Sequence, residues 1–165
     1  MAVFVVVHIG RRPSRLPELL NRDSRLPASF AQHDVPIRSG RIYVAPPDHH
    51  MLLDAGRIRL SRGPKIRGTR PAVDPLFQSA AAAYGEQVIG VILSGADSDG
   101  AAGLRAIEAR GGLVLVQRPD DAAVPSMPTA AIIADHPDAC LPAEGLARRI
   151  AAECSLEPHG MSQQV

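Results

Sequence analysis

The sequence predicts an α/β fold, with a doubly wound, mainly parallel, Rossmann-like three-layer sheet and a small antiparallel hairpin. Three apolar runs, at Val3 to Val7, Val88 to Leu93 and Leu113 to Val116, lack the alternation of polar and apolar residues that a half-exposed strand shows. A helical pattern follows each run. Strands that alternate with helices form right-handed βαβ units, so we expect helices on both faces of the sheet.

The helices after the three runs are expected at Pro13 to Arg22, Asp99 to Arg110 and Ser126 to Ala134. The first has leucines spaced to lie on one helical face, and the second ends at a pair of glycines, a common helix terminator. These helices supply the crossovers that parallel strands require.

The segment between the first and second runs holds the expected hairpin. Arg41 to Ala45 is predicted as a short strand, and Met51 to Leu53 and Ile58 to Leu60 flank the turn sequence Asp54-Ala55-Gly56. Gly63 to Pro71 contains almost nothing apolar and is predicted as a loop.

Two further helices complete the pattern. Asp74 to Tyr84 contains a run of alanines that allows close packing, and Glu144 to Cys154 forms the closing helix. We therefore expect one domain over residues 1–155, followed by a flexible tail over residues 156–165.

Composition excludes several classes of protein. The 165 residues are 45% hydrophobic and 21% charged with a formal net charge of +1, which argues against a strongly basic nucleic-acid binder. Aromatic residues make up only 3%, so stacking platforms for single strands are not expected. No apolar stretch approaches the roughly 18 residues of a membrane span. With no signal peptide before Ala2 and only two cysteines, we expect a cytoplasmic protein without membrane insertion.

The segments that resemble metal-binding or nucleotide-binding motifs match them only in part. Gly63 to Gly68 has the outer glycine spacing of a phosphate-binding loop, but Thr69 stands where lysine is required. Asp97 to Gly100 lacks the glutamate that completes a calcium loop. The neighbouring His49 and His50 are interpreted as turn or packing residues, because no further ligand cluster supports them. No cofactor or metal is predicted.

Two polar residues follow neighbouring parts of the predicted sheet. His8 ends the first apolar run, and Asp99 follows the second through a short turn. Each has a structural interpretation by itself, as a strand-end histidine or a helix-capping carboxylate. Together they suggest a histidine base oriented by a carboxylate, since strands of a parallel sheet end at one edge. Asp97 competes with Asp99, which is preferred because Gly100 frees the backbone beside it.

Five collinear segments between about Val3 and Ala152 carry a family resemblance. They are Val5 to His8, Ile42 to Met51, Arg70 to Ala81, Leu93 to Leu104 and Pro125 to Pro128. Together they resemble the catalytic domain of the chemotaxis protein-glutamate methylesterases, the CheB type.

The resemblance implies a serine hydrolase that removes methyl esters from glutamate side chains of chemoreceptors and deamidates certain glutamines. His8 would be the general base and Asp99 its orienting acid, and the backbone N–H of Ala96, where the family usually has Met, would help to form the oxyanion hole. Ser94 and Met127 are candidates for the substrate groove. The expected partners are the methylated cytoplasmic helices of chemoreceptors and, without a receiver domain, a separate regulator.

The expected nucleophile is missing from the sequence as given. In the family it is a serine in a Gly-x-Ser-x-Gly-Gly-like elbow before the histidine strand, and no such elbow occurs in these 165 residues. Ser94 and Ser98 do not inherit its role. The leading interpretation is a methylesterase domain whose sequence lacks that segment through truncation or a misplaced start. The alternatives are an inactive binding module for a receptor or regulator, and an unrelated α/β small-molecule binder.

The segment after the histidine also departs from the family. Ile9 to Pro13 stands where the usual sequence is Met-Pro and an aromatic residue, a departure that bears on substrate selection. If the nucleophile strand is central in the sheet, Val3 to Val7 and Val88 to Leu93 should flank an empty slot. Alternatively, these two strands close up and pair directly.

Overall fold

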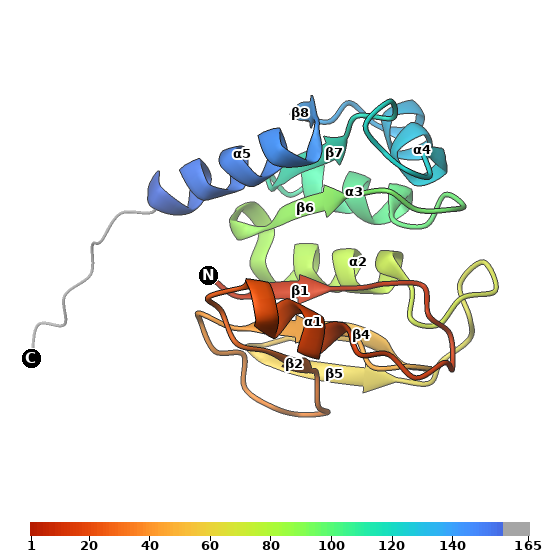
Figure 1. Cartoon of the computed structure of the whole chain (residues 1–165), viewed down its shortest axis with the longest axis vertical. Coiled ribbons are helices and arrows are strands. Elements are labelled where there is room, and N and C mark those ends of the chain that lie inside the picture. The colour runs from red at the N-terminus through yellow and green to blue at the C-terminus, as the bar shows by residue number, and fades with distance from the viewer. Residues whose placement is uncertain (157–165) are drawn as a thin grey trace, which may run out of the picture.

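The computed structural model describes residues 1–156, and Figure 1 shows its elements. The residues 157–165 of the expected tail lie outside the described range. The strands are β1 (Val3–Val5), β2 (Ala28–Phe30), β3 (Ile42–Val44), β4 (His50–Asp54), β5 (Arg57–Ser61), β6 (Ile89–Ile92), β7 (Leu113–Gln117) and β8 (Ala139–Leu141). The helices are α1 (Leu16–Asp23), α2 (Val73–Tyr84), α3 (Ala101–Glu108), α4 (Ser126–Ala134) and α5 (Ala143–Leu156), with one short 3-10 turn, η1 (Gly85–Gln87).

The parallel strands form two separate sheets of three strands each. Their orders are β1-β3-β2 and β6-β7-β8, and every pairing within them is parallel. Strands β4 and β5 form the expected antiparallel hairpin, in which Met51 lies opposite Leu60. The α/β class, the parallel strands and the hairpin are therefore confirmed, while the parallel sheet is divided into two halves.

The division falls between β1 and β6. In the described part of the chain, β1 pairs only with β3 and β6 pairs only with β7, so each presents one unpaired edge. The two strands lie on facing sides of the gap between the halves (Figure 1). The alternative in which they close up and pair directly is wrong, and the arrangement is the one that an empty slot requires.

Helices cover both halves and α2 joins them. Helix α1 packs on the β1-β3-β2 sheet through Leu16 and Leu20, while α2 and the hairpin pack together against Phe4 and Val6. Helices α2, α3 and α4 share a second core with β6 and β7. Phe77 of α2 contacts both of these cores, so α2 holds the two halves together despite their separate sheets.

The contact between α2 and α3 depends on Gly103. A Cβ atom at this position would overlap the Cβ of Phe77 and lie 3.2 Å from Asp74 Oδ1. Alanine normally stabilises a helix relative to glycine, by about 1 kcal/mol. Here the overlap should dominate, and we expect Gly103→Ala to lower the free energy of unfolding by about 1–3 kcal/mol. Urea unfolding measures the difference, and unchanged or increased stability would contradict this packing.

The sequence-based element bounds differ from the structure at several points. Strand β1 ends at Val5, so His8 lies in the segment after the strand rather than at its last residue. Helix α1 begins at Leu16 rather than Pro13, and α3 begins at Ala101 rather than Asp99. Strand β2 was not predicted because its three residues, Ala-Ser-Phe, carry no periodic pattern. None of the described helices is long and apolar enough to span a bilayer.

Candidate functional site

His8 and Asp99 meet at the carboxyl ends of β1 and β6. The Nε2 atom of His8 lies 2.7 Å from Asp99 Oδ2, although the residues are 91 positions apart in the sequence. The imidazole is 22% exposed, whereas the Asp99 side chain is 1% exposed. The structure thus brings together the two residues that the sequence singled out, one accessible and one buried. Asp97, the competing carboxylate, is exposed and accepts a hydrogen bond from its neighbour Ser98 instead.

Asp99 caps helix α2 rather than α3, the helix that follows it in the sequence. Its Oδ2 accepts the N–H of Val73 at 2.5 Å and its Oδ1 accepts the N–H of Asp74 at 3.0 Å, both in the first turn of α2. Burial raises the pKa of the Asp99 carboxyl, but the hydrogen bonds from His8 and these two N–H groups outweigh it, so the pKa is lowered. Asp99 is therefore held as a carboxylate, beside the positive end of α2.

This contact fixes the protonation pattern of the His8 ring. An ionised carboxylate only accepts hydrogen bonds, so Nε2 must carry the proton that it shares with Asp99. Nδ1 is then the basic nitrogen, and it makes no hydrogen bond to any residue in the described range. A ring with one nitrogen held by a carboxylate and the other free has the arrangement of a general base.

No described serine, threonine or cysteine side chain hydrogen-bonds to His8. The hydroxyl of Ser94 accepts a hydrogen bond from the N–H of Val124 at 2.9 Å and donates one to the Val124 carbonyl at 3.4 Å. The Ser98 hydroxyl contacts Asp97. The described residues therefore bring a histidine and a buried carboxylate together without a hydroxyl or thiol hydrogen-bonded to the histidine.

The turn after β6 presents an unused backbone donor. Gly95 is fixed on both sides, because its N–H donates to Val124 O and its carbonyl accepts the N–H of Met127, each at 2.9 Å. Asp97 has a φ of 75°, a left-handed conformation that redirects the chain. Between them, the N–H of Ala96 makes no hydrogen bond to any described residue. A free N–H in a rigid turn is a suitable oxyanion donor.

The two groove candidates have different surroundings. Ser94 is exposed, and its N–H donates to the side-chain oxygen of the buried Gln117 at 2.8 Å. Met127 is only 8% exposed, and its thioether packs so closely on Gly95 that a Cβ there would overlap it. In this position Met127 supports the turn that carries Ala96, and sequence reasoning missed Gln117 as the residue that anchors the same turn.

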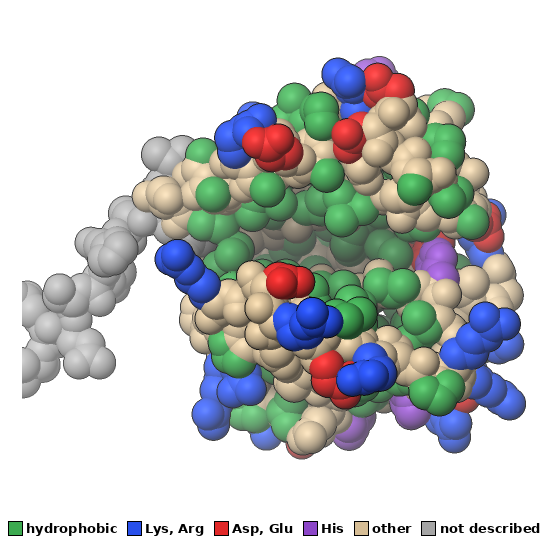
Figure 2. Space-filling view, in the orientation of Figure 1, with side chains coloured by type: hydrophobic (Ala, Val, Ile, Leu, Met, Phe, Trp, Pro, Cys, Tyr) green, Lys and Arg blue, Asp and Glu red, His purple; other side chains and the backbone are tan. Residues whose placement is uncertain are grey.

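An open hollow lies beside His8. It has a volume of about 670 Å³ and is lined by residues 7–10 and 12–15 and by Leu16 and Leu19 of α1. Figure 2 shows the surface hollowed between the two halves, with hydrophobic side chains on its walls. Val7 and Leu19, which line the hollow, are 43% and 52% exposed, and Leu93, directly after β6, is 50% exposed. Apolar surface at the slot is therefore available for burial.

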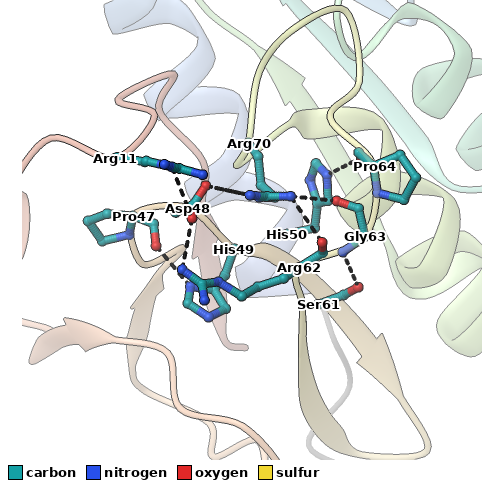
Figure 3. Close-up of polar contacts among 10 residues, drawn as sticks. All are labelled: Arg11, Pro47, Asp48, His49, His50, Ser61, Arg62, Gly63, Pro64 and Arg70. Atoms are coloured by element: carbon teal, nitrogen blue, oxygen red, sulfur yellow. Dashed lines mark hydrogen bonds and ion pairs between the residues drawn. The ribbon is translucent and has the colours of Figure 1, made fainter.

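A second buried carboxylate supports the loop after His8. Asp48 is 5% exposed, and its backbone N–H donates to the carbonyl of Gly10 at 2.8 Å. Its side chain is surrounded by the guanidinium groups of Arg11, Arg62 and Arg70 (Figure 3). The hydrogen bonds from Arg70, followed by Arg62 and the charge of Arg11, lower the pKa of Asp48 to about 2 against the cost of burial.

This lowered pKa predicts a dependence of stability on pH. Asp48 contributes fully above its ordinary pKa of 3.8, and the contribution is lost as the pH falls through about 2. We expect Asp48→Asn to melt at a lower temperature than the original protein at pH 7, with a difference that shrinks between pH 4 and pH 2. Asp54→Asn, at an exposed carboxylate of the hairpin, is the control. An equal difference at pH 7 and pH 2 would contradict the assignment.

The two adjacent histidines each lie within hydrogen-bonding distance of a backbone carbonyl. His49 Nδ1 lies 2.8 Å from the carbonyl of Pro47, and His50 Nε2 lies 2.9 Å from that of Pro64. Among the residues that the structure describes, no group of three or more His, Cys, Asp and Glu side chains is placed to hold a metal. The role of Asp48 was missed because its partners lie 14, 22 and 37 positions away, and only the clustering of arginines in loops hinted at it.

Known proteins resemble this chain over nearly all of its length. Residues 1–150 match the family described as CheB methylesterase. A Leptospira interrogans protein, named for protein-glutamate methylesterase and protein-glutamine glutaminase activities, is 38% identical over 88% of this chain and 76% of its own length. The "protein-glutamate methylesterase/protein-glutamine glutaminase 2" of Anaeromyxobacter dehalogenans is 41% identical over 90% of this chain, which spans only 44% of that protein.

A solved structure agrees with these sequence matches. The Thermotoga maritima CheB methylesterase catalytic domain superposes with a TM-score of 0.83 at 29% identity, covering 91% of this chain and 82% of the other. The likeness therefore extends through both sheets and the helices that cover them. With the family match over residues 1–150 and the identity to full-length relatives, the chain belongs to the CheB methylesterase family.

Proposed function

We propose that this chain provides the base and oxyanion half of a protein-glutamate methylesterase site that acts on chemoreceptors in the cytoplasm. The observation that carries the proposal is the 2.7 Å contact between His8 Nε2 and Asp99 Oδ2, which leaves His8 Nδ1 free. Relatives that are named as protein-glutamate methylesterases and glutaminases support the proposal. The substrates are γ-methyl esters of glutamate, and glutamine amides, on the receptors' cytoplasmic helices.

The reaction needs a hydroxyl nucleophile near Nδ1 of His8. We place it on a serine carried by an additional strand, which pairs with the open edges of β1 and β6. Both edges are unpaired in the described chain and lie on either side of the gap. A strand in this slot would also bury Val7 and Leu93, which are exposed at its walls.

In the first step, His8 Nδ1 accepts the proton of the serine hydroxyl as the oxygen attacks the ester carbonyl. Asp99 stabilises the imidazolium through Nε2–H, and the N–H of Ala96 donates to the oxyanion. Collapse of the tetrahedral intermediate breaks the bond to the methoxy oxygen, and His8 returns its proton to release methanol. Water then hydrolyses the acyl-enzyme, with His8 again as the base, and leaves a glutamate carboxylate and a regenerated serine.

The test is release of methanol from methylated receptor membranes. A longer version of the chain, carrying an in-frame upstream segment with a Gly-x-Ser-x-Gly elbow, should release methanol, and His8→Ala in that version should abolish it. Binding to the receptor without any release, by the longer version, would instead favour an inactive recognition module. Release that survives His8→Ala would contradict the assigned base.

A further inference from the structure

Three arginines from two loops converge on one carboxylate, as Figure 3 shows. Arg11 follows β1, Arg62 follows β5, and Arg70 precedes α2. Arg70 Nη2 lies 2.7 Å from Asp48 Oδ1, while Arg62 Nη2 and Arg11 Nε lie 2.9 Å and 3.4 Å from Asp48 Oδ2. One carboxylate balances only one of the three cations, so two positive charges remain in the cluster.

The three arginines differ in how many donors they have left. Arg70 is 12% exposed, and its N–H groups bind Asp48 Oδ1 and the carbonyls of Arg62 and Gly63. It is a structural residue with its hydrogen bonds satisfied. Arg11 and Arg62 are 77% and 67% exposed, and among the described residues each contacts only Asp48 Oδ2 through its guanidinium group. Most N–H groups of these two guanidiniums are therefore available to another acceptor.

The cluster is adjacent to the His8 site. Arg11 is three residues beyond His8, and three residues span at most about 10 Å. The bond from Asp48 N–H to Gly10 O ties the intervening loop to the cluster. Arg12 is exposed on the same loop and lines the hollow next to His8. Positive charge is thus concentrated beside the site, although the net charge of the whole chain is only +1.

A second loop adds positive charge on the same side. Lys65 and Arg67 are exposed in the loop that Arg70 ties down, and neither forms an ion pair with a described residue. Arg70, which ties this loop down, is three residues before Val73, whose N–H donates to Asp99 Oδ2. Both loops therefore carry exposed cations next to the arginine cluster at Asp48.

We propose that Arg11 and Arg62, held by Asp48, bind acidic side chains of the substrate protein on one side of the reacting ester. This inference rests on the proposed function for the identity of the substrate, and it adds how that substrate is selected. A guanidinium matches the planar geometry of a carboxylate, and residues three or four apart on a helix present their side chains about 6 Å apart. The shared carboxylate of Asp48 keeps both arginines oriented before the substrate arrives, which lowers the entropy cost of binding.

An acidic protein segment fits better than a nucleic acid. Only 3% of the residues are aromatic, so no stacking surface for bases accompanies the cations. The two exposed arginines stand on the surface around Asp48 rather than around a closed phosphate cradle. Exposed charges of this kind act mainly on selection and on the rate of encounter, which suits the choice of one ester among many.

The test is binding of a labelled helical peptide to the 165-residue chain, measured by fluorescence anisotropy. The peptide carries one glutamate γ-methyl ester and two glutamates that lie one helical turn apart on the same side of it, and a matched peptide has glutamines at these two positions. The double variant Arg11→Gln, Arg62→Gln should weaken binding of the acidic peptide about three- to tenfold at low salt. Binding of the glutamine peptide should be weaker at the outset and unchanged by the variant.

Controls separate recognition from folding and from general charge. Arg110→Gln removes an exposed arginine before β7, at the opposite end of the sheet, and should leave both affinities unchanged. Thermal melts must show that the double variant is folded, as the exposure of both side chains predicts. Equal loss for both peptides, no loss for the acidic one, or no binding at all would overturn the proposal. Stronger competition by millimolar inorganic phosphate than by acetate would also overturn it, in favour of a phosphate site.

The outcome is distinguishable from that of the proposed function, because binding requires no turnover. Selective binding of the acidic peptide, with no methanol release by the longer version of the chain, would remove the esterase assignment and keep the arginine surface. Methanol release that is equally fast for receptor sites with and without neighbouring acids would remove the arginine surface and keep the esterase assignment.

Discussion

A version of the chain with a serine elbow on a strand that fits the slot is expected to release methanol about a million times faster than the 165-residue chain. Loss of a triad nucleophile typically costs this factor, because only binding and oxyanion stabilisation remain. In the described chain, no hydroxyl or thiol hydrogen-bonds to His8, so the shorter chain should show no measurable turnover.

The comparison has a direct control. Replacing the elbow serine by alanine in the longer version should return the rate to that of the short chain, while the added strand still fills the slot. Turnover of the 165-residue chain within tenfold of the longer version, and lost on His8→Ala, would show that a nucleophile within the present sequence had been missed.

The second large effect is expected for Asp99→Asn in the longer version. An asparagine amide placed toward Nε2 favours the tautomer with the proton on Nδ1, so the ring can no longer accept a proton from the nucleophile. The same change in a serine-protease triad lowers kcat about ten-thousandfold, and we expect a similar factor here. Initial rates of methanol release at saturating receptor measure it.

Asp97→Asn is the matched control, because Asp97 is an exposed carboxylate two residues away that contacts Ser98 rather than His8. It should reduce the rate by no more than a few-fold. Adding His8→Ala to Asp99→Asn should cost little beyond His8→Ala alone, since residues that act as a unit are not additive. A larger effect of Asp97→Asn than of Asp99→Asn would reverse the assignment of the acid.

The sequence predicts the strands and the dyad because both depend on local patterns. Uninterrupted apolar runs identify β1, β6 and β7, and the rule that parallel strands end at one edge brings His8 and Asp99 together. The sequence did not predict which helix Asp99 caps. Its carboxylate binds the first turn of α2, 25 residues earlier, rather than the start of α3.

Long-range polar contacts could not be predicted. Asp48 stands in a turn with a φ of 58° and binds arginines from two loops, which no periodicity records. Gln117 reaches from the end of β7 to the N–H of Ser94 in the same way. Such contacts depend on how the strand ends lie beside one another, so they become visible only in the folded chain.

A nitrogen-15 NMR spectrum of the imidazole shows directly whether Asp99 holds the proton of His8 on Nε2 and leaves Nδ1 as the base. It needs only the 165-residue chain and no turnover. At a pH where the ring is neutral, His8 should give the Nε2–H tautomer, with its proton strongly shifted by the 2.7 Å contact, and Asp99→Ala should remove that shift. A ring protonated on Nδ1, or a spectrum that Asp99→Ala leaves unchanged, would contradict the account.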